Sequence, residues 1–351
     1  MSSAMTTGIG AAAALGAAMA TGVVAGLGAE RLLMARSFRN DEPTEPYGTL
    51  RADPRWVTAD DGTELYVEID EPDDPGAQDV TIIFSHGYSL NLDTWHYQRR
   101  DLRGHARLVF WDQRSHGRSG RGPEGSHTID QLGSDLGRVL DECAATGRVM
   151  LVGHSMGGMT IMGLAGLRPQ LFGSRVLGAA LLATSSGHLD EVTLRLPAPA
   201  ARIVQHRTEN LAALMHAQSA GIDRGRTRTT DLNFLLTKRY SFGEERVSRA
   251  HTQFVADLLS STPIDVVADY LPEFGRHDKV VALAALQRIA TLIMVGDSDA
   301  LTPESHSRVM LRHIPGADLV VVPQTGHMII SERPDVADRN LLALLDVVRA
   351  S

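Results

Sequence analysis

Apolar residues gather along this chain in short continuous runs rather than in an alternating pattern. Six such runs occupy residues 80–84, 107–111, 148–152, 177–183, 291–295 and 318–322. A strand that is buried on both faces has this pattern, and the strands of parallel sheets are buried in this way. The runs therefore predict a mostly parallel sheet that is covered on both sides.

Segments with helical periodicity lie between these runs, at 129–143, 159–172, 303–314 and 334–350. Alternation of strand and helix is typical of an α/β fold, an open central sheet flanked by helices. Ahead of the first run, Trp56–Thr58 and Glu64–Ile69 flank the turn at Asp60–Gly62. This arrangement predicts an additional β-hairpin.

One long interval, residues 188–290, contains no strand-like run. It has helical patterns of mixed polarity, such as 202–221 and 251–261, and a structureless loop of this length is uncommon. We therefore expect four regions: an apolar N-terminal segment at 1–40, a first core part at 41–187, a helical cap at 188–290 and a last core part at 291–351. Residues 40–53 are polar and contain proline, which predicts a linker.

The segment Thr6–Ala29 carries no charge and is long enough to cross a bilayer, which takes about 20 residues. Three interpretations stay open: a membrane-anchoring helix, a signal peptide with a cleavage motif at Ala18–Ala20, or a soluble Ala/Gly-rich helix. Arginines follow at once, so a spanning helix predicts membrane association with the rest of the chain in the cytoplasm. The other two interpretations predict a secreted protein or a soluble cytoplasmic one.

Charge and cysteine content exclude further classes. The chain of 351 residues has a formal net charge of −8, and its Lys and Arg residues form no basic stripe, which argues against nucleic-acid binding. Cys143 is the single cysteine, so no disulfide forms within the chain and we expect a small buried side chain there. No metal-ligand spacing such as HExxH occurs, so no metal site is expected. The oligomeric state stays open.

The stretch LVGHSMGG at 151–158 places one serine between glycines, directly after an apolar run and before a helical pattern. A strand-to-helix turn this tight strains the central residue and leaves no room for side chains two positions away, which accounts for Gly153 and Gly157. The Ser155 hydroxyl is then held above the sheet, near the N–H groups at the start of the helix.

A serine hydroxyl is a weak nucleophile, so it needs a base, and the base needs an orienting acid. The stretch GDSDALTP follows the run at 291–295 and supplies Asp297 and Asp299. The stretch PQTGH follows the run at 318–322 and supplies His327. Both follow the carboxyl end of a strand, where open α/β sheets build their sites.

Four motifs together resemble the α/β-hydrolase fold from about Trp56 onwards: FSHGYSLN (84–91), WDQRSHGRS (111–119), GHSMGG (153–158) and the pair GDSDALTP with TGH. The resemblance implies that the backbone N–H groups of Tyr88 and Met156 form the oxyanion hole. It gives architectural roles to three residues of the turn that follows the second run: Asp112, Arg114 and Ser119. The family spacing places the acid at Asp299, with Asp297 as the alternate.

The resemblance implies a serine hydrolase that cleaves carboxylic esters, or lipid acyl esters, through an acyl-enzyme intermediate. Ser155, His327 and Asp299 would form the triad, and no cofactor is required. Peptide or amide cleavage and a non-catalytic ligand-binding role stay open, because a fold does not determine a reaction. The expected partner is a small-molecule ester or lipid, with membrane contact through the N-terminal helix as a further expectation.

Overall fold

The computed structural model describes residues 45–189, 212–213, 215–217, 219, 237–243 and 247–351. Within them, eight strands form one sheet in the order β1-β2-β4-β3-β5-β6-β7-β8. Their bounds are β1 Pro54–Thr58, β2 Glu64–Asp70, β3 Val80–Ser85, β4 Arg107–Trp111, β5 Arg148–His154, β6 Val176–Leu182, β7 Ala290–Gly296 and β8 Asp318–Val322.

The six strands from β3 to β8 pair in parallel, as the continuous apolar runs predict. The predicted hairpin is also present: β1 and β2 pair antiparallel, and β2 joins the sheet antiparallel to β4. The parallel strands all end at one edge, so the loops that follow β3, β5, β7 and β8 are brought together there.

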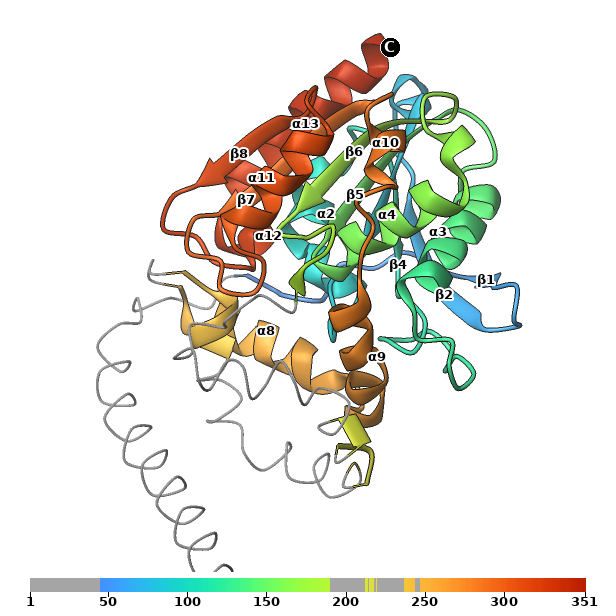
Figure 1. Cartoon of the computed structure of the whole chain (residues 1–351). Coiled ribbons are helices and arrows are strands. Elements are labelled where there is room, and N and C mark those ends of the chain that lie inside the picture. Colours follow the sequence, from blue (N-terminus) through green and yellow to red (C-terminus); the bar gives the residue numbers. More distant parts are fainter. Residues whose placement is uncertain (1–44, 190–211, 214, 218, 220–236, 244–246) are drawn as a thin grey trace, which may run out of the picture.

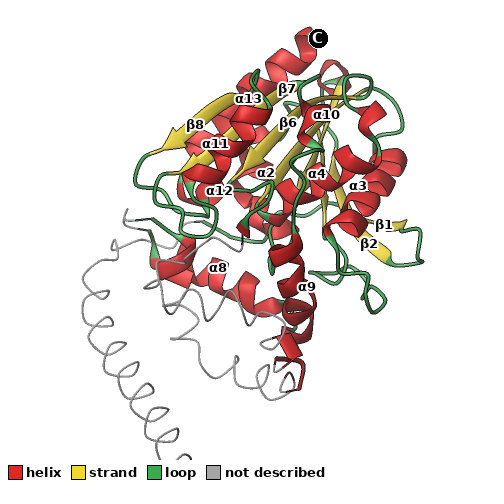
Figure 2. Ribbon diagram, viewed as in Figure 1, coloured by secondary structure: helices red, strands yellow, loops and turns green. Residues whose placement is uncertain are grey.

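Helices cover both faces of the sheet (Figure 1, Figure 2). Their bounds are α2 His96–Leu102, α3 Ile129–Cys143, α4 Met156–Leu167, α8 Arg249–Ser261, α9 Ile264–Arg276, α10 Leu283–Leu286, α11 Glu304–His313, α12 Ile329–Glu332 and α13 Pro334–Ala350, with short 3-10 turns η1 Pro75–Gln78, η2 Leu92–Trp95 and η3 Pro169–Leu171. The predicted helices at 129–143 and 334–350 agree with α3 and α13. Cys143, at the end of α3, is buried as expected.

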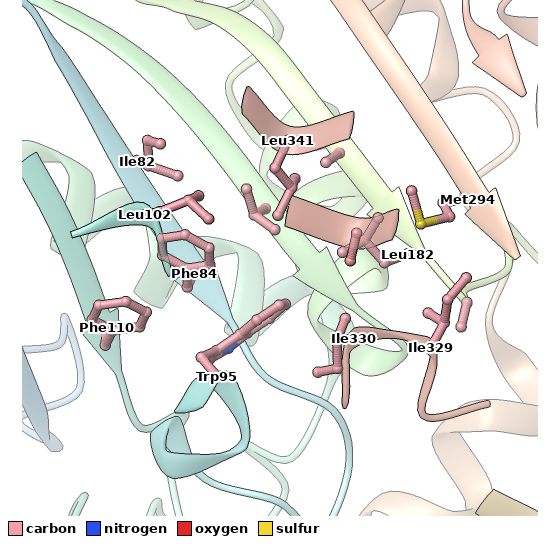
Figure 3. Packing of buried hydrophobic residues seen from close by; sticks show 14 of the residues in the cluster. Ile82, Phe84, Trp95, Leu102, Phe110, Leu182, Met294, Ile329, Ile330 and Leu341 are labelled. Carbon is pink, nitrogen blue, oxygen red and sulfur yellow. The ribbon is translucent and has the colours of Figure 1, made fainter. Parts of the chain in front are cut away.

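The core has two layers, because successive side chains of a strand point to opposite faces. In β3, Ile82 and Phe84 belong to the cluster beneath α2, α12 and α13, whereas Ile83 belongs to the cluster beneath α3, α4, α10 and α11. Figure 3 shows part of the first cluster, where Phe84 and Phe110 stack with ring centroids 4.6 Å apart and Trp95 lies alongside. Because successive side chains point to opposite faces, each continuous apolar run contributes residues to both layers.

Two helical segments differ from the sequence-based expectation. The helix expected at 159–172 is α4, which starts earlier, at Met156, and ends at Leu167, before Pro169. The expected cap interval 188–290 also takes in α10, yet Leu283 and Leu286 of α10 are buried in the core cluster. The second difference arises because local periodicity does not reveal which surface a short helix such as α10 will contact.

The expected linker at 40–53 is docked from Glu45 onwards. Tyr47 stacks on His251 and Phe254 of α8, with ring centroids 5.6 and 4.8 Å away, and Glu45 lies 2.6 Å from His96 of α2. The polar composition predicted a linker, but the one aromatic ring in this stretch, that of Tyr47, packs on aromatic rings of α8. The segment therefore joins α2 to α8.

The expected membrane helix at Thr6–Ala29 and most of the helical pattern at 202–221 lie outside the described residues. Among the residues that are described, none belongs to a helix with both the length and the apolar character needed to cross a bilayer.

The turn after β4 fixes the edge of the sheet through buried polar groups. The Asp112 carboxylate accepts hydrogen bonds from the backbone N–H groups of Leu92 and Arg118, at 2.7 and 2.8 Å. The Ser119 hydroxyl donates to the Asp112 carbonyl at 2.5 Å. Arg114 forms a two-point ion pair with Asp135 of α3, at 2.6 and 2.7 Å.

We expect the change Arg114→Met to lower the free energy of unfolding by about 3–5 kcal/mol, because it leaves the Asp135 charge buried without its partner. Both side chains are fully buried. Denaturant-induced unfolding measures the change. The control Arg138→Met breaks a half-exposed pair with Glu142 and should cost less than about 1 kcal/mol. Equal effects of the two variants would contradict an architectural role for Arg114.

Candidate active site

Ser155 occupies the turn between β5 and α4 with φ 54° and ψ −118°, a backbone conformation that is strained for a residue with a side chain. A Cβ atom at Gly157 would lie 1.9 Å from the Ser85 carbonyl oxygen, and one at Gly153 would lie 2.4 Å from the Gly157 carbonyl oxygen. The turn therefore closes only with glycine at both positions, as the sequence predicts. The Ser155 side chain stays partly exposed at the edge of the sheet.

His327 and Asp299 come from the loops after β8 and β7, and the structure brings them together. The His327 Nδ1 atom lies 2.9 Å from Asp299 Oδ2. Asp299 is 5% exposed, whereas the alternate acid, Asp297, is exposed and contacts the Ser298 hydroxyl at 3.0 Å. Of the two aspartates that the sequence offers, Asp299 is the one in contact with the imidazole.

The Asp299 carboxylate is held ionised within the protein. Burial raises its pKa, but the adjacent His327 and the hydrogen bonds from Thr302 outweigh burial and leave the pKa below its usual value. Thr302 donates its hydroxyl to Oδ2 at 2.8 Å, and the N–H groups of Leu301 and Thr302 donate to Oδ1 at 2.8 and 2.9 Å. An ionised carboxylate only accepts, so the Nδ1 atom of His327 carries the proton and its Nε2 atom is a base.

His154, the residue before the serine, fixes the backbone of His327. Its Nε2 atom lies 2.9 Å from the His327 carbonyl oxygen, which only accepts, so Nε2 is the protonated nitrogen. Burial, with His327 next to it, lowers the pKa of His154 to about 3, and the ring is neutral at physiological pH. A hydrogen bond thus links the chain segment that carries Ser155 to the one that carries His327.

The two expected oxyanion donors belong to segments that adjoin the serine. Met156 is the first residue of α4, and the N–H groups of a first helical turn have no partner within the helix. Tyr88 belongs to the loop after β3, where a Cβ atom at Gly87 would come within 3.3 Å of the Ser155 Cβ. His86 supports this loop: its Nδ1 atom lies 2.8 Å from the Gly87 carbonyl oxygen, and its Nε2 accepts from the Gln113 N–H at 2.9 Å.

A pocket of about 320 Å³ opens above these residues, and Tyr88, Ser155 and His327 all line it. Asp299 and Met156 are buried and do not line it. Part of its lining comes from α8 and from residues 237–241. The complete lining among the described residues is Gly87, Tyr88, Ser89, Leu90, His154, Ser155, Thr237, Tyr240, Ser241, Ala256, Leu259, Ser260, Leu301, His327 and Met328.

Thr302 was not predicted from the sequence. The sequence also did not indicate which residues of the interval 188–290 line the pocket. Thr302 follows Asp299 by three residues, a spacing at which an aspartate commonly caps the next backbone turn, so the signal was present in GDSDALTP. Ala256, Leu259 and Ser260 have no comparable local signal. Their helix is amphipathic, and periodicity does not tell a pocket wall from an interior face.

Comparison with known proteins agrees with this fold. Residues 82–339 match the profile described as the alpha/beta hydrolase family. An esterase from Escherichia coli is 25% identical over 270 residues, which cover 76% of this chain and 92% of the esterase. The solved structure of a thermophilic esterase from Thermogutta terrifontis has a TM-score of 0.66 at 22% identity and covers 85% of this chain and 99% of the esterase.

A longer relative is matched over part of its length. The dihydrolipoyllysine-residue acetyltransferase component of the acetoin cleaving system of Pseudomonas putida is 23% identical over 279 residues, which are 77% of this chain and 64% of that protein. The chain thus spans less than two thirds of this relative. The family profile nevertheless covers most of the sheet and the loops that carry the site. The chain belongs to the alpha/beta hydrolase family.

Proposed function

We propose that this protein is a serine hydrolase that cleaves small carboxylic esters through an acyl-enzyme intermediate. The contact between His327 Nδ1 and Asp299 Oδ2, in a site whose pocket Ser155 also lines, carries the proposal. It leaves the imidazole with a basic Nε2 atom on the pocket side of the pair. The names of relatives such as the E. coli esterase are consistent with this chemistry.

The proposed reaction has two covalent steps. The Ser155 oxygen attacks the ester carbonyl carbon while His327 Nε2 takes the hydroxyl proton, and Asp299 stabilises the imidazolium that forms. The carbonyl oxygen becomes an oxyanion, which the N–H groups of Tyr88 and Met156 stabilise. His327 then protonates the departing alcohol. In the second step, His327 activates a water molecule that releases the acid and regenerates Ser155.

The pocket favours an uncharged and fairly small acyl group. Its volume is near the lower end of the range for small-molecule sites, about 300–1,000 Å³. Its described lining contains no aspartate, glutamate, lysine or arginine. The surfaces of Leu259, Leu301 and Met328 match an aliphatic or aromatic group, and α8 acts as part of a cap over the site.

A series of p-nitrophenyl esters tests the substrate class. We expect kcat/KM for the butyrate ester to exceed that for the palmitate ester, and both to exceed turnover of aminoacyl amides. Appreciable amide cleavage with negligible ester cleavage would favour the peptidase alternative. A preference for palmitate would favour lipid acyl esters, the wider substrate class that the sequence left open.

One variant tests whether α8 limits the acyl chain. We expect Leu259→Ala to raise the ratio of kcat/KM for hexanoate over acetate by about tenfold, because each methylene accommodated in an apolar pocket changes binding by about 1–3 kcal/mol. The control Leu342→Ala removes the same atoms from α13, away from the pocket, and should leave the ratio unchanged. An unchanged ratio of hexanoate to acetate kcat/KM in Leu259→Ala would contradict a role for α8 in limiting the acyl chain.

A further inference from the structure

A third apolar cluster connects the proposed oxyanion hole to α9, the helix that follows α8 in the chain (Figure 1). Met156 of α4 is buried in this cluster together with Val266 and Tyr270 of α9, and Tyr88 packs against it. Both residues whose N–H groups are proposed to stabilise the oxyanion therefore place their side chains against the same helix. The remaining members are Ile129, Leu132 and Met159, with Leu189 and Phe274 packed alongside.

Tyr88 is held to α9 by its ring and by its hydroxyl. The hydroxyl donates a hydrogen bond to the backbone carbonyl of Val267. The ring makes edge contacts with Phe274 and Tyr270, with centroids 4.8 and 6.3 Å away. These contacts restrain the side chain of a loop residue whose neighbour, Gly87, lies against Ser155.

The helix α9 is itself attached to the core and does not rest on Tyr88 alone. Arg121, in the loop after β4, pairs with Asp265 at 3.1 Å and with Asp269 at 2.8 Å. The Glu273 carboxylate accepts a hydrogen bond from the Ile129 N–H at the start of α3, at 3.2 Å. Through these contacts α9 has a fixed position relative to the sheet, as a support for a loop requires.

We propose that α9 positions the oxyanion hole, and that Tyr88 transmits its position to the loop after β3. This proposal rests on the proposed function, since it concerns the same hole. An oxyanion donor acts only when it lies at hydrogen-bond distance from the charge that develops in the transition state, and removing one donor lowers kcat by about 10²–10³-fold. A donor displaced by a fraction of an ångström loses part of that effect. Tyr88 is thus a positioning residue through its side chain.

The variant Tyr88→Phe tests this inference, because it removes the bond to Val267 and keeps both the ring and the backbone N–H. We expect kcat for p-nitrophenyl butyrate to fall about tenfold with KM changed less than about twofold. The control Tyr97→Phe removes a different tyrosine hydroxyl bond, 2.7 Å long, to Tyr47. Tyr97 does not line the pocket, and kcat should stay at the wild-type value.

Inhibitor binding separates a displaced oxyanion hole from a loosened fold. Ser155 adds to the carbonyl carbon of a trifluoromethyl ketone, the carbonyl oxygen becomes an oxyanion, and the proton moves to His327. The matching methyl ketone measures pocket binding. In Tyr88→Phe we expect the inhibition constant of the trifluoromethyl ketone to rise in proportion to the loss in kcat, and that of the methyl ketone to stay constant. Equal rises for both ketones would overturn the proposal.

A second variant on α9 itself keeps the inference testable if Tyr88→Phe folds poorly. Phe274→Leu retains most of the volume and removes the ring contact with Tyr88, and we expect a drop of about threefold in kcat. Combined with Tyr88→Phe, it should lower kcat by less than the product of the two single effects, because both substitutions act by displacing the same side chain, that of Tyr88. Wild-type kcat in Phe274→Leu, or full multiplication of the effects in the double variant, would overturn the role of α9. An inactive wild-type enzyme would instead refute the proposed function.

Discussion

Replacing Ser155 with alanine is expected to lower kcat for p-nitrophenyl butyrate by about 10⁶-fold, the scale on which loss of a triad nucleophile acts. The substitution removes the atom that forms the covalent bond and leaves the pocket in place. KM or ligand affinity should therefore change little, and the thermal unfolding temperature should stay close to that of the wild type. Steady-state rates of the purified variant, binding of a methyl ketone and thermal unfolding measure kcat, ligand affinity and stability in turn.

The matched control is Ser174→Ala. The Ser174 hydroxyl donates to the Gln170 carbonyl at 2.6 Å in the turn before β6, outside the pocket lining, so its loss should leave kcat unchanged. Ser155→Ala with a substantial fraction of wild-type turnover would mean that another group supplies the nucleophile. In that case the strained turn at Ser155 would need an explanation other than catalysis.

Replacing Asp299 with asparagine is expected to lower kcat by about 10⁴-fold, because an amide can donate to His327 and thereby favour the wrong tautomer. The ionised carboxylate fixes the proton on Nδ1, and the lowered pKa of Asp299 keeps it ionised well below neutral pH. Loss of activity on mild acidification therefore should not arise from protonation of Asp299. Steady-state rates of Asp299→Asn measure the loss in kcat. The pH profile of the wild type shows whether its activity on mild acidification follows the titration of Asp299.

The neighbouring aspartate provides the control. Asp297 precedes Asp299 by two residues, is exposed and contacts the Ser298 hydroxyl, so Asp297→Asn should change kcat by less than about threefold. The pair of variants distinguishes the two acids that the sequence offered. Comparable losses in both, or the greater loss in Asp297→Asn, would contradict the assignment of the acid to Asp299.

The sheet could be predicted because its signal is local. Each continuous apolar run became a parallel strand, and β3 shows why: Ile82 and Ile83 point into opposite core layers, so consecutive positions of the strand carry apolar side chains. The docking of Tyr47 on α8 and the packing of α10 in the core were not predictable in this way. They depend on contacts between distant segments, which periodicity does not encode.

The candidate site was predictable where chemistry and strand ends coincide. Gly153 and Gly157 follow from the tight turn around Ser155, and His327 follows a strand whose carboxyl end reaches the same edge. The family resemblance placed the acid at Asp299 with Asp297 as the alternate, and the contact of Asp299 with the His327 imidazole is the structural observation that separates the two. The bond from Tyr88 to Val267 also needed it, because 179 positions separate the two residues in the sequence.

The most direct test of the central claim is to treat the wild-type protein with a fluorophosphonate and locate the adduct by peptide mass spectrometry. The proposed mechanism predicts one adduct on the Ser155 oxygen, formed rapidly in the wild type, at least about 10³-fold more slowly in His327→Gln, where no imidazole base remains, and at wild-type rate in Asp297→Asn. A protein that hydrolyses esters yet carries no label, or carries it on a residue other than Ser155, would contradict the account.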